Sequence, residues 1–300
     1  MTYRAYRYRF YPTPEQVDQL NRTFGCVRYV YNRSLRYRQD AWYERQENVS
    51  YLQNSAALTE WKKEAERAWL NEVSSVPLQQ CLRHLQTAYR NFFQGRAKYP
   101  VTKKKDRGQS AEYTASAFKW NGESLKLAKQ SEPLAVRWSR RFKGTPTTVT
   151  VSRDSSGRYF VSMLVDESID THPVVRSVVG VDVGIHSIAM TSEGRAYGNP
   201  HFTDRYAAKL AKYQRRLAKK QAKSKNRLKA KQKVARIHAK IADCRRDFTH
   251  KLTTTLINEN QVICVENLAV KNMVKNPNLA KSIHDANWGE LVRQLEYKAG

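Results

Sequence analysis

The sequence is poor in acidic residues and has no long apolar run. Its 300 residues include 27 Asp and Glu against 54 Lys and Arg, which gives a net charge of +27. Such an excess destabilises a folded chain unless a polyanion offsets it, so the composition argues against an ordinary metabolic enzyme and favours a nucleic-acid partner. An anionic membrane surface is the second candidate. No apolar run approaches the roughly 20 residues that cross a bilayer, so we expect no membrane-spanning segment.

Paired cysteines and common catalytic signatures are also missing. The four cysteines, Cys26, Cys81, Cys244 and Cys264, form no CxxC pair, and no histidine lies near them at zinc-finger spacing. We therefore expect four buried, reduced cysteines and no zinc site within these residues. The signatures GxGxxG, GxxxxGKS/T and HExxH are absent. Basic and aromatic residues alternate at the N-terminus, unlike a signal peptide, so we expect a cytoplasmic protein.

That alternation predicts a strand over residues 3–10. Tyr6, Tyr8 and Phe10 fall on one face of the strand and Arg7 and Arg9 on the other, a period of two. The aromatic side chains either fill a hydrophobic core or stack on nucleic-acid bases.

Residues 12–95 have the periodicity of helices. Thr13 and Gln16 match a capping box at the start of a helix that runs into the forties. A second helical stretch covers 50–70. The apolar stripe of a third helix is formed by Leu78, Leu82, Leu85, Tyr89 and Phe92. The segment is predicted to be a small helical bundle.

Residues 96–172 instead predict short strands separated by turns. The expected strands cover 113–120, 124–127, 134–138, 147–152 and 159–165. With the strand at 3–10 they suggest a small antiparallel β-barrel into which the helical bundle is inserted. We thus expect one domain from residues 1–11 plus 96–172, a helical domain over 12–95, and a linker at His172-Pro173.

Residues 173–300 predict an α/β domain. Two apolar runs, 178–184 and 261–266, are typical of buried strands. Between them, a helical hairpin over 204–251 carries 18 Lys and Arg against three acids. We expect this hairpin to bind the phosphate backbone of a nucleic acid. A final helix is expected over 285–299.

Two acids interrupt the apolar runs: Asp182 lies within the first and Glu266 at the end of the second. A capping role, a turn, or a salt bridge to the basic hairpin would explain each one singly. If the strands are neighbours in one sheet, however, the carboxylates lie side by side and repel unless a divalent cation bridges them. Such a pair, completed by a third acid, is how a two-metal phosphoryl-transfer site is built.

Several segments match the motifs of one family. They cover residues 10–12, 25–32, 88–93, 180–185, 265–268, 279–283, 288–290 and 293–299. Together they resemble TnpB-type proteins, the transposon-encoded RNA-guided DNA endonucleases also called OrfB transposases. Residues 180–185 resemble the first RuvC motif of this family and 265–268 the second.

The resemblance implies an α+β multidomain fold, with a wedge-like barrel, an inserted recognition lobe and a RuvC domain of RNase H fold. It implies a guide RNA from the transposon end and target double-stranded DNA as partners, and a prokaryotic protein that is nucleoid-associated when bound to DNA. Asp182 and Glu266 match catalytic positions that bind Mg²⁺. The residues expected to contact nucleic acid are Tyr51, Gln79, Arg83, Lys103, Lys104, Lys105, Arg215, Arg216, Lys219, Lys220, Arg227 and Arg236.

The family sequence continues past the position of Ala299, with two CxxC pairs that hold zinc and a third RuvC acid. These 300 residues contain neither, so we expect a nuclease domain that is incomplete at its C-terminus. Two functions stay open: an RNA-guided, Mg²⁺-dependent DNA endonuclease that hydrolyses phosphodiesters, and a nuclease-dead protein that binds guide RNA or target DNA. A polybasic membrane-surface protein is a third alternative.

Overall fold

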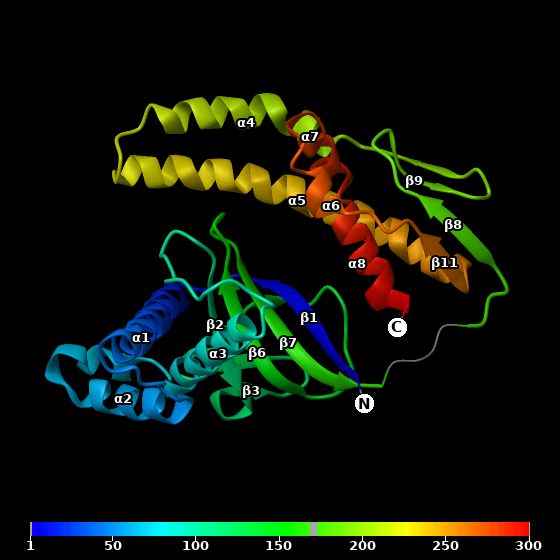
Figure 1. The fold of residues 1–300 in the computed structure, drawn as a ribbon. Helices are drawn as coiled ribbons and strands as arrows, with labels where there is room; N and C mark the ends of the chain where they lie inside the picture. Colours follow the sequence, from blue (N-terminus) through cyan, green and yellow to red (C-terminus); the bar gives the residue numbers. More distant parts are fainter. Residues whose placement is uncertain (1, 169–172, 300) are drawn as a thin grey trace. The chain divides into compact units, whose positions relative to one another are not determined.

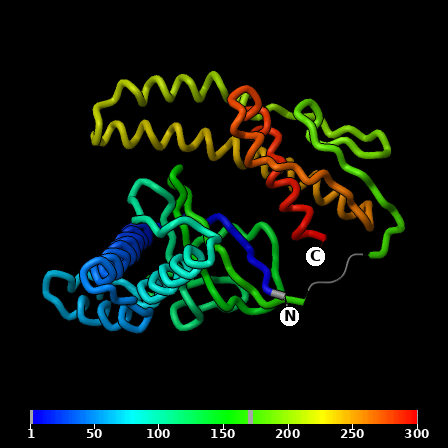
Figure 2. Tube along the Cα trace, viewed as in Figure 1, coloured from blue at the N-terminus to red at the C-terminus, as the bar shows by residue number. Residues whose placement is uncertain are grey.

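The computed structural model describes residues 2–168 and 173–299, so the expected linker residue His172 lies outside the described residues. The chain divides into two compact units, Met1–Ile169 and Asp170–Gly300. Each unit has its own hydrophobic core. Figure 1 shows the elements of both units, and Figure 2 traces the same chain as a tube. No helix in the described ranges is long and apolar enough to cross a bilayer.

The first unit combines a five-stranded antiparallel sheet, a two-stranded sheet and a group of helices. Its elements are β1 (Thr2–Phe10), α1 (Pro14–Arg45), α2 (Tyr51–Lys63), η1 (Ala65–Glu72), α3 (Ser75–Phe93), β2 (Gln109–Thr114), η2 (Ala115–Ala117), β3 (Phe118–Trp120), β4 (Leu125–Leu127), β5 (Val136–Arg137), β6 (Pro146–Arg153) and β7 (Tyr159–Glu167). The helices α1, α2 and α3 are therefore inserted in the sequence between β1 and the other strands of its sheet.

The expected barrel is not closed. The five-stranded sheet has the order β2-β6-β7-β1-β5, while β3 and β4 pair only with each other. β1 pairs along its whole length with β7, from Thr2 opposite Glu167 to Phe10 opposite Tyr159. On its other side it meets β5 through only two residue pairs. The two edge strands of this sheet, β5 and β2, do not pair with each other, so the sheet is open.

The aromatic residues of β1 belong to the core. Tyr6, Tyr8 and Phe10 are buried in the same hydrophobic core as apolar residues of α1 and α3. The base-stacking alternative is therefore wrong for these three side chains. The arginines at alternate positions, Arg7 and Arg9, lie on the opposite face of the strand, as the period of two predicts.

Capping boxes begin two helices of this unit. At α1, the Thr13 hydroxyl accepts a hydrogen bond from the Gln16 backbone N–H at 3.3 Å, and Gln16 Oε1 accepts one from the Thr13 N–H at 3.1 Å, as predicted. Ser50 and Gln53 repeat the arrangement at α2. Each box satisfies backbone donors that a helix start leaves without intrahelical partners.

The second unit is built on a four-stranded sheet and a long helical hairpin. Its elements are β8 (Val178–Asp182), β9 (Ser187–Thr191), β10 (Ala196–Gly198), α4 (Phe202–Ala218), α5 (Lys225–Glu259), β11 (Val262–Val265), α6 (Val270–Met273), α7 (Pro277–Ala286) and α8 (Trp288–Ala299). The strand order is β10-β9-β8-β11. α4 and α5 lie side by side as the predicted hairpin (Figures 1 and 2).

The expected final helix is α8, which begins at Trp288 rather than at 285, and a separate helix, α7, precedes it. α7 ends at Ala286 and is capped by Asn287, whose backbone is left-handed with φ of +60°. The Asn287 side-chain amide donates to the Thr249 hydroxyl at 3.2 Å, which holds the bend against α5. Asparagine tolerates this conformation better than most residues, which is why the chain turns here.

The sheet of the second unit is covered on one face only. Side chains of α5, α7 and α8 bury Val179, Val181 and Val183 on that face. Val178 and Val262 remain 64% and 46% exposed on the other face. The expectation that both apolar runs are fully buried strands is therefore wrong, because the helices pack against a single side.

Candidate active site and nucleic-acid surfaces

The register of two parallel strands brings the two predicted acids together. β11 runs parallel to β8, with Cys264 opposite Gly180 and Val265 opposite Val181. The next residues are Glu266 and Asp182, so the acids stand side by side where the two strands end. Adjacent strands lie about 4.8 Å apart, which sets the scale for the separation of the two backbones. The structure therefore meets the condition under which the sequence would place the two acids side by side, that their strands are neighbours in one sheet.

Both acids belong to the uncovered face of the sheet. Val181 points into the core, and Asp182 and Glu266 are exposed. They line a shallow hollow of about 520 Å³. The other residues lining it are Gly180, Val181, Met190, Thr191, Ser192, Cys264 and Val265. The carboxylates therefore face an open surface that a polymeric substrate can reach.

The backbone after Asp182 is held in place by a tight loop. The indole N–H of Trp288, a buried residue of α8, donates to the carbonyl oxygen of Gly184 at 3.2 Å. A Cβ added at Gly184 would lie 2.9 Å from the carbonyl oxygen of Ser187, closer than side-chain carbons come to backbone oxygens. The side-chain amide of Asn199 donates to the Ile185 carbonyl at 2.8 Å. These contacts fix the end of β8 and thereby position Asp182.

The carboxylate pair offers suitable ligands for a hard divalent cation. Carboxylate oxygens are preferred by Mg²⁺, and two adjacent acids concentrate negative charge at one place. No ion pair within residues 2–168 or 173–299 involves Asp182 or Glu266. A salt bridge to the basic hairpin therefore does not explain either acid.

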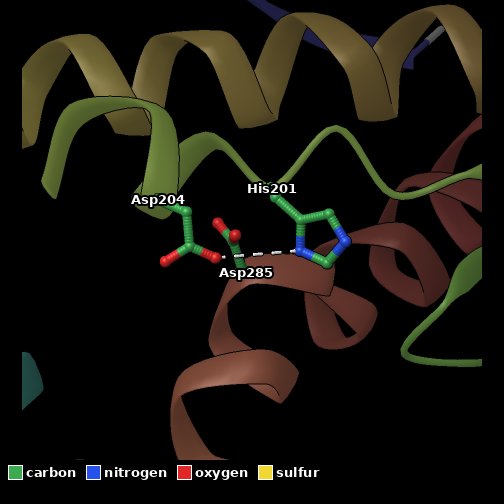
Figure 3. A group of neighbouring side chains, drawn as sticks. All are labelled: His201, Asp204 and Asp285. Carbon is green, nitrogen blue, oxygen red and sulfur yellow. Dashed lines mark ion pairs between the residues drawn. The ribbon is translucent and has the colours of Figure 1, made fainter.

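A second acidic group was not predicted from the sequence. The ligand atoms of His201, Asp204 and Asp285 lie within 4.8 Å of one another (Figure 3). Asp285 is only 4% exposed. Its carboxylate accepts hydrogen bonds from the Thr203 N–H and hydroxyl at 3.1 and 2.9 Å. Arg245 donates to the same carboxylate from Nε at 2.9 Å and from Nη2 at 2.8 Å.

Protein cations neutralise this second group. Lys281 Nζ lies 2.5 Å from the Asp204 carboxylate, and this hydrogen bond lowers the pKa of Asp204. His201 Nδ1 is 4.0 Å from Asp204. Because Arg245 and Lys281 already occupy the two carboxylates, the group serves as a clamp between α4, α5 and α7 and does not fit a metal centre.

In the first unit, the structure brings three predicted nucleic-acid contacts to one surface. Tyr51 is the first residue of α2, and Gln79 and Arg83 are exposed one turn apart on α3. The Arg83 guanidinium lies 5.2 Å from the centroid of the Tyr51 ring. Residues four apart share a helix face, so Gln79 presents its amide beside this pair.

The three lysines at 103–105, which are predicted nucleic-acid contacts, differ in their exposure. The Lys103 ammonium lies 4.4 Å from the centre of the Tyr31 ring, and burial lowers the pKa of Lys103. Its backbone exchanges two hydrogen bonds with the Asn32 side chain, at 2.7 and 3.0 Å. Lys104 and Lys105 are exposed. Lys103 therefore anchors the loop, and the two following lysines are available to a phosphate.

The hairpin presents most of its predicted contacts to solvent. The exposed members are Arg215, Arg216, Lys219, Lys220 and Arg236. Arg227 is half-buried, and its Nη1 donates to the carbonyls of Leu217 and Lys220 at 3.2 and 2.9 Å. Arg227 thus satisfies carbonyl groups at the C-terminal end of α4, a structural role.

The cysteines differ in environment. Cys26 and Cys81 are buried, and burial raises the pKa of their thiols to about 11 and about 12. Cys264 is exposed, so the expectation that all four cysteines are buried is wrong. The reason is again the uncovered sheet face, because Cys264 shares that face with Glu266.

Two family models match the chain. OrfB_IS605, described as a probable transposase, matches residues 160–277, and a model described as a helix-turn-helix domain matches residues 1–47. In the structure the latter residues form the strand β1 and the single continuous helix α1.

Named relatives cover nearly the whole chain. A protein of Streptomyces pristinaespiralis named "Putative RNA-guided DNA endonuclease" is 55% identical over 98% of this chain and 74% of its own length. A protein of Escherichia coli (strain K12) named "Putative RNA-guided DNA endonuclease InsQ" is 32% identical over 98% of this chain and 77% of its own. A cryo-EM structure titled as a Cas12f1-sgRNA-target DNA complex resembles the fold, with a TM-score of 0.51, 12% identity, and coverage of 96% of this chain and 71% of that one.

Proposed function

The chain belongs to the TnpB-type, or OrfB, family, and from that membership we propose that it is an RNA-guided DNA endonuclease. A guide RNA from the transposon end would direct it to matching double-stranded DNA. The observation that carries the proposal is the adjacency of Asp182 and Glu266 at the ends of β8 and β11. The names of both relatives favour a cleaving protein over the nuclease-dead alternative.

The proposal assigns a role to each part of the chain. Residues 1–11 and 96–172 would form the wedge domain, with residues 12–95 as the recognition lobe. Residues 173–300 would form a RuvC-like nuclease domain of RNase H type. The parallel pairing of β8 with β11 and the two acids on their open face support this last assignment.

The relatives' endonuclease names imply a divalent metal, and we propose that Asp182 and Glu266 hold Mg²⁺ in this chain. Their oxygen donors, their position on an open face and the lack of a competing cation among the described ion pairs support the assignment. Bound Mg²⁺ would supply water activation and charge stabilisation in phosphodiester hydrolysis. Trp288 and the Gly184 loop would hold the Asp182 carboxylate in position for this role.

The basic surfaces would hold the nucleic acids. We propose that Arg215, Arg216, Lys219, Lys220 and Arg236 of the hairpin contact the sugar–phosphate backbone. Tyr51, Gln79 and Arg83 would contact a short DNA motif next to the target sequence. Their convergence on one surface supports a shared ligand. Lys104 and Lys105 would bind phosphate groups next to the recognition lobe.

A cleavage assay tests the proposal. The 300-residue chain is purified with its transposon-end RNA and given plasmid DNA with a matching target and Mg²⁺. We expect guide-dependent cutting, reduced by roughly 100-fold or more in Asp182→Ala and in Glu266→Ala, with target binding retained in a gel-shift assay. Glu193→Ala, at an exposed acid in the turn after β9, is the control and should cut normally. Target binding with no cutting by the unmutated chain would contradict the endonuclease proposal.

A further inference from the structure

A hollow on α1 is lined by basic side chains that the proposed cleavage chemistry does not use. Its volume is about 350 Å³. The lining residues are Gly25, Arg28, Tyr29, Asn32, Arg33 and Arg36. Their spacing of three and four places them on one face of the helix. Three of the six are arginines and none is an acid, so the hollow is suited to an anion.

Two of these guanidinium groups are partly removed from water and have neutral neighbours. Arg28 Nη1 donates to the side-chain carbonyl of Gln109 at 2.8 Å. The Arg33 guanidinium lies 4.9 Å from the centre of a Trp61 ring. Arg33 Nε is buried and has no hydrogen-bond partner in the described part of the chain. Removing a cation from water without an anionic partner is costly, and a bound anion would offset that cost.

The segment that carries Lys103, Lys104 and Lys105 is attached to the same face of α1. Asn32 is bonded to the backbone of Lys103 in both directions. Gln109, which accepts from Arg28, also donates from Nε2 to the Lys104 and Arg107 carbonyls at 3.0 and 2.9 Å. These bonds hold the exposed residues Lys104 and Lys105 at the edge of the hollow.

We propose that Arg28, Arg33, Arg36, Lys104 and Lys105, the α1 basic surface, bind consecutive phosphates of one nucleic-acid strand. Arg28 and Arg36 are eight residues apart, about 12 Å along the axis at 1.5 Å per residue. One strand of a DNA duplex presents about three phosphates over that length. A Cβ added at Gly25 meets no atom within 4 Å, so the protein does not close this end of the hollow. A nucleic-acid strand bound in the hollow could therefore continue past Gly25.

This inference rests on the proposed function, because that function identifies the bound polyanion as either the guide RNA or the target DNA. Both carry the same phosphodiester chemistry, so separate binding experiments distinguish them. Fluorescence anisotropy is measured over a salt series, once with the guide RNA and once with target duplex added to the guide-loaded protein. The variants are the triple Arg28→Gln, Arg33→Gln, Arg36→Gln and the double Lys104→Gln, Lys105→Gln.

The control variant also removes arginines from α1, but arginines that do not line the hollow. Arg22 and Arg45 of α1 pair with Glu72 and Glu47, at 2.6 and 3.0 Å, and the control neutralises both arginines. For the triple variant we expect the slope of log affinity against log salt to become smaller by about 2 to 3 with one of the two nucleic acids, which then identifies the source. Control-like slopes and affinities with both nucleic acids would overturn the inference.

Two further variants keep the test valid if the triple variant unfolds. Arg36 is exposed, and its only ion pair in the described part of the chain is an exposed one with Asp40 at 3.7 Å, so Arg36→Gln should cost little stability and should reduce the slope by about 1. Gly25→Glu places a negative charge at the open end of the hollow and should weaken the same binding. Glu193→Ala, which changes an exposed acid outside this surface, should bind as the unmutated chain does. Binding that depends on the α1 basic surface without any cleavage would contradict the endonuclease proposal and support this inference.

Discussion

Asp182 and Glu266 are neighbours because β8 and β11 pair in parallel with Val181 opposite Val265. The whole α4–α5 hairpin separates the two acids in the sequence, so only the sheet brings them together. Val181 lies in the core while both acids are exposed, which fixes the face on which the acids stand. A one-residue slip of β11 would move Glu266 to the covered face and separate the pair.

The loop after Asp182 leaves no room for a side chain at Gly184. Gly184→Ala would place a Cβ 2.9 Å from the Ser187 carbonyl oxygen, a backbone atom that cannot move aside cheaply. We expect the loop to shift, cleavage to fall about tenfold and the free energy of unfolding to fall by about 1 to 3 kcal/mol. Cleavage and urea unfolding measure the two effects. Gly198→Ala, where an added Cβ has no neighbour within 4 Å, is the control. If Gly184→Ala cleaves DNA as fast as the control Gly198→Ala does, the loop does not position Asp182.

The clamp around Asp285 should contribute strongly to the stability of the second unit. Asp285→Ala leaves the Arg245 guanidinium without its carboxylate, and breaking such a buried pair costs about 3 to 5 kcal/mol. Asp247→Ala removes an exposed pair with Lys251 and should change stability by less than about 1 kcal/mol. Urea unfolding of both variants checks the difference, and similar midpoints would contradict a structural clamp.

Lowering the pH should destabilise the turn between β6 and β7, because the Asp154 carboxylate becomes protonated. Burial opposes ionisation of this carboxylate, but hydrogen bonds from Ser156 and Arg158 outweigh it and lower the pKa of Asp154 below its ordinary value of 3.8. A lowered folded-state pKa gives stability that is complete above the unfolded pKa and is lost as pH falls through the folded one. We expect Asp154→Asn to remove part of the decline in thermal stability between about pH 5 and pH 2. A variant with the same pH profile as the unmutated chain would refute this.

Cys264 should react readily with thiol reagents in the native protein. It is exposed beside the acids, whereas Cys26 and Cys81 are buried, with the pKa of each thiol raised. We expect iodoacetamide to modify Cys264 before either buried cysteine, by peptide mapping, and the adduct to inhibit cleavage by filling the hollow. Cys264→Ser should keep its activity under the same treatment. Inhibition that persists in Cys264→Ser would place the sensitive thiol elsewhere.

Local sequence patterns predicted much of this fold. The alternation in residues 3–10, the Thr13–Gln16 capping box and the basic hairpin each depend on neighbouring residues, and the structure contains all three. The sequence also singled out Asp182 and Glu266, but it placed them side by side only on the condition that their strands are neighbours, which the pairing of β8 with β11 supplies.

Features that depend on distant contacts were not predictable. An apolar run does not tell how many faces of its strand are covered, so the exposure of Cys264 was missed. Lys103 was expected to contact nucleic acid, but it is half-buried against Tyr31 and Asn32. Arg33 is visible on α1 in the sequence, yet its partial burial arises from Trp61 in another helix.

The magnesium dependence of cleavage tests the central claim most directly. Asp182→Asn and Glu266→Gln keep the shape of each side chain and remove its charge. If the two carboxylates hold the cation, the Mg²⁺ concentration for half-maximal cleavage should rise at least about tenfold in each variant, or cleavage should be absent at every concentration. Cleavage with the rate and the Mg²⁺ dependence of the unmutated chain in both variants would contradict the assignment of Asp182 and Glu266 as metal ligands.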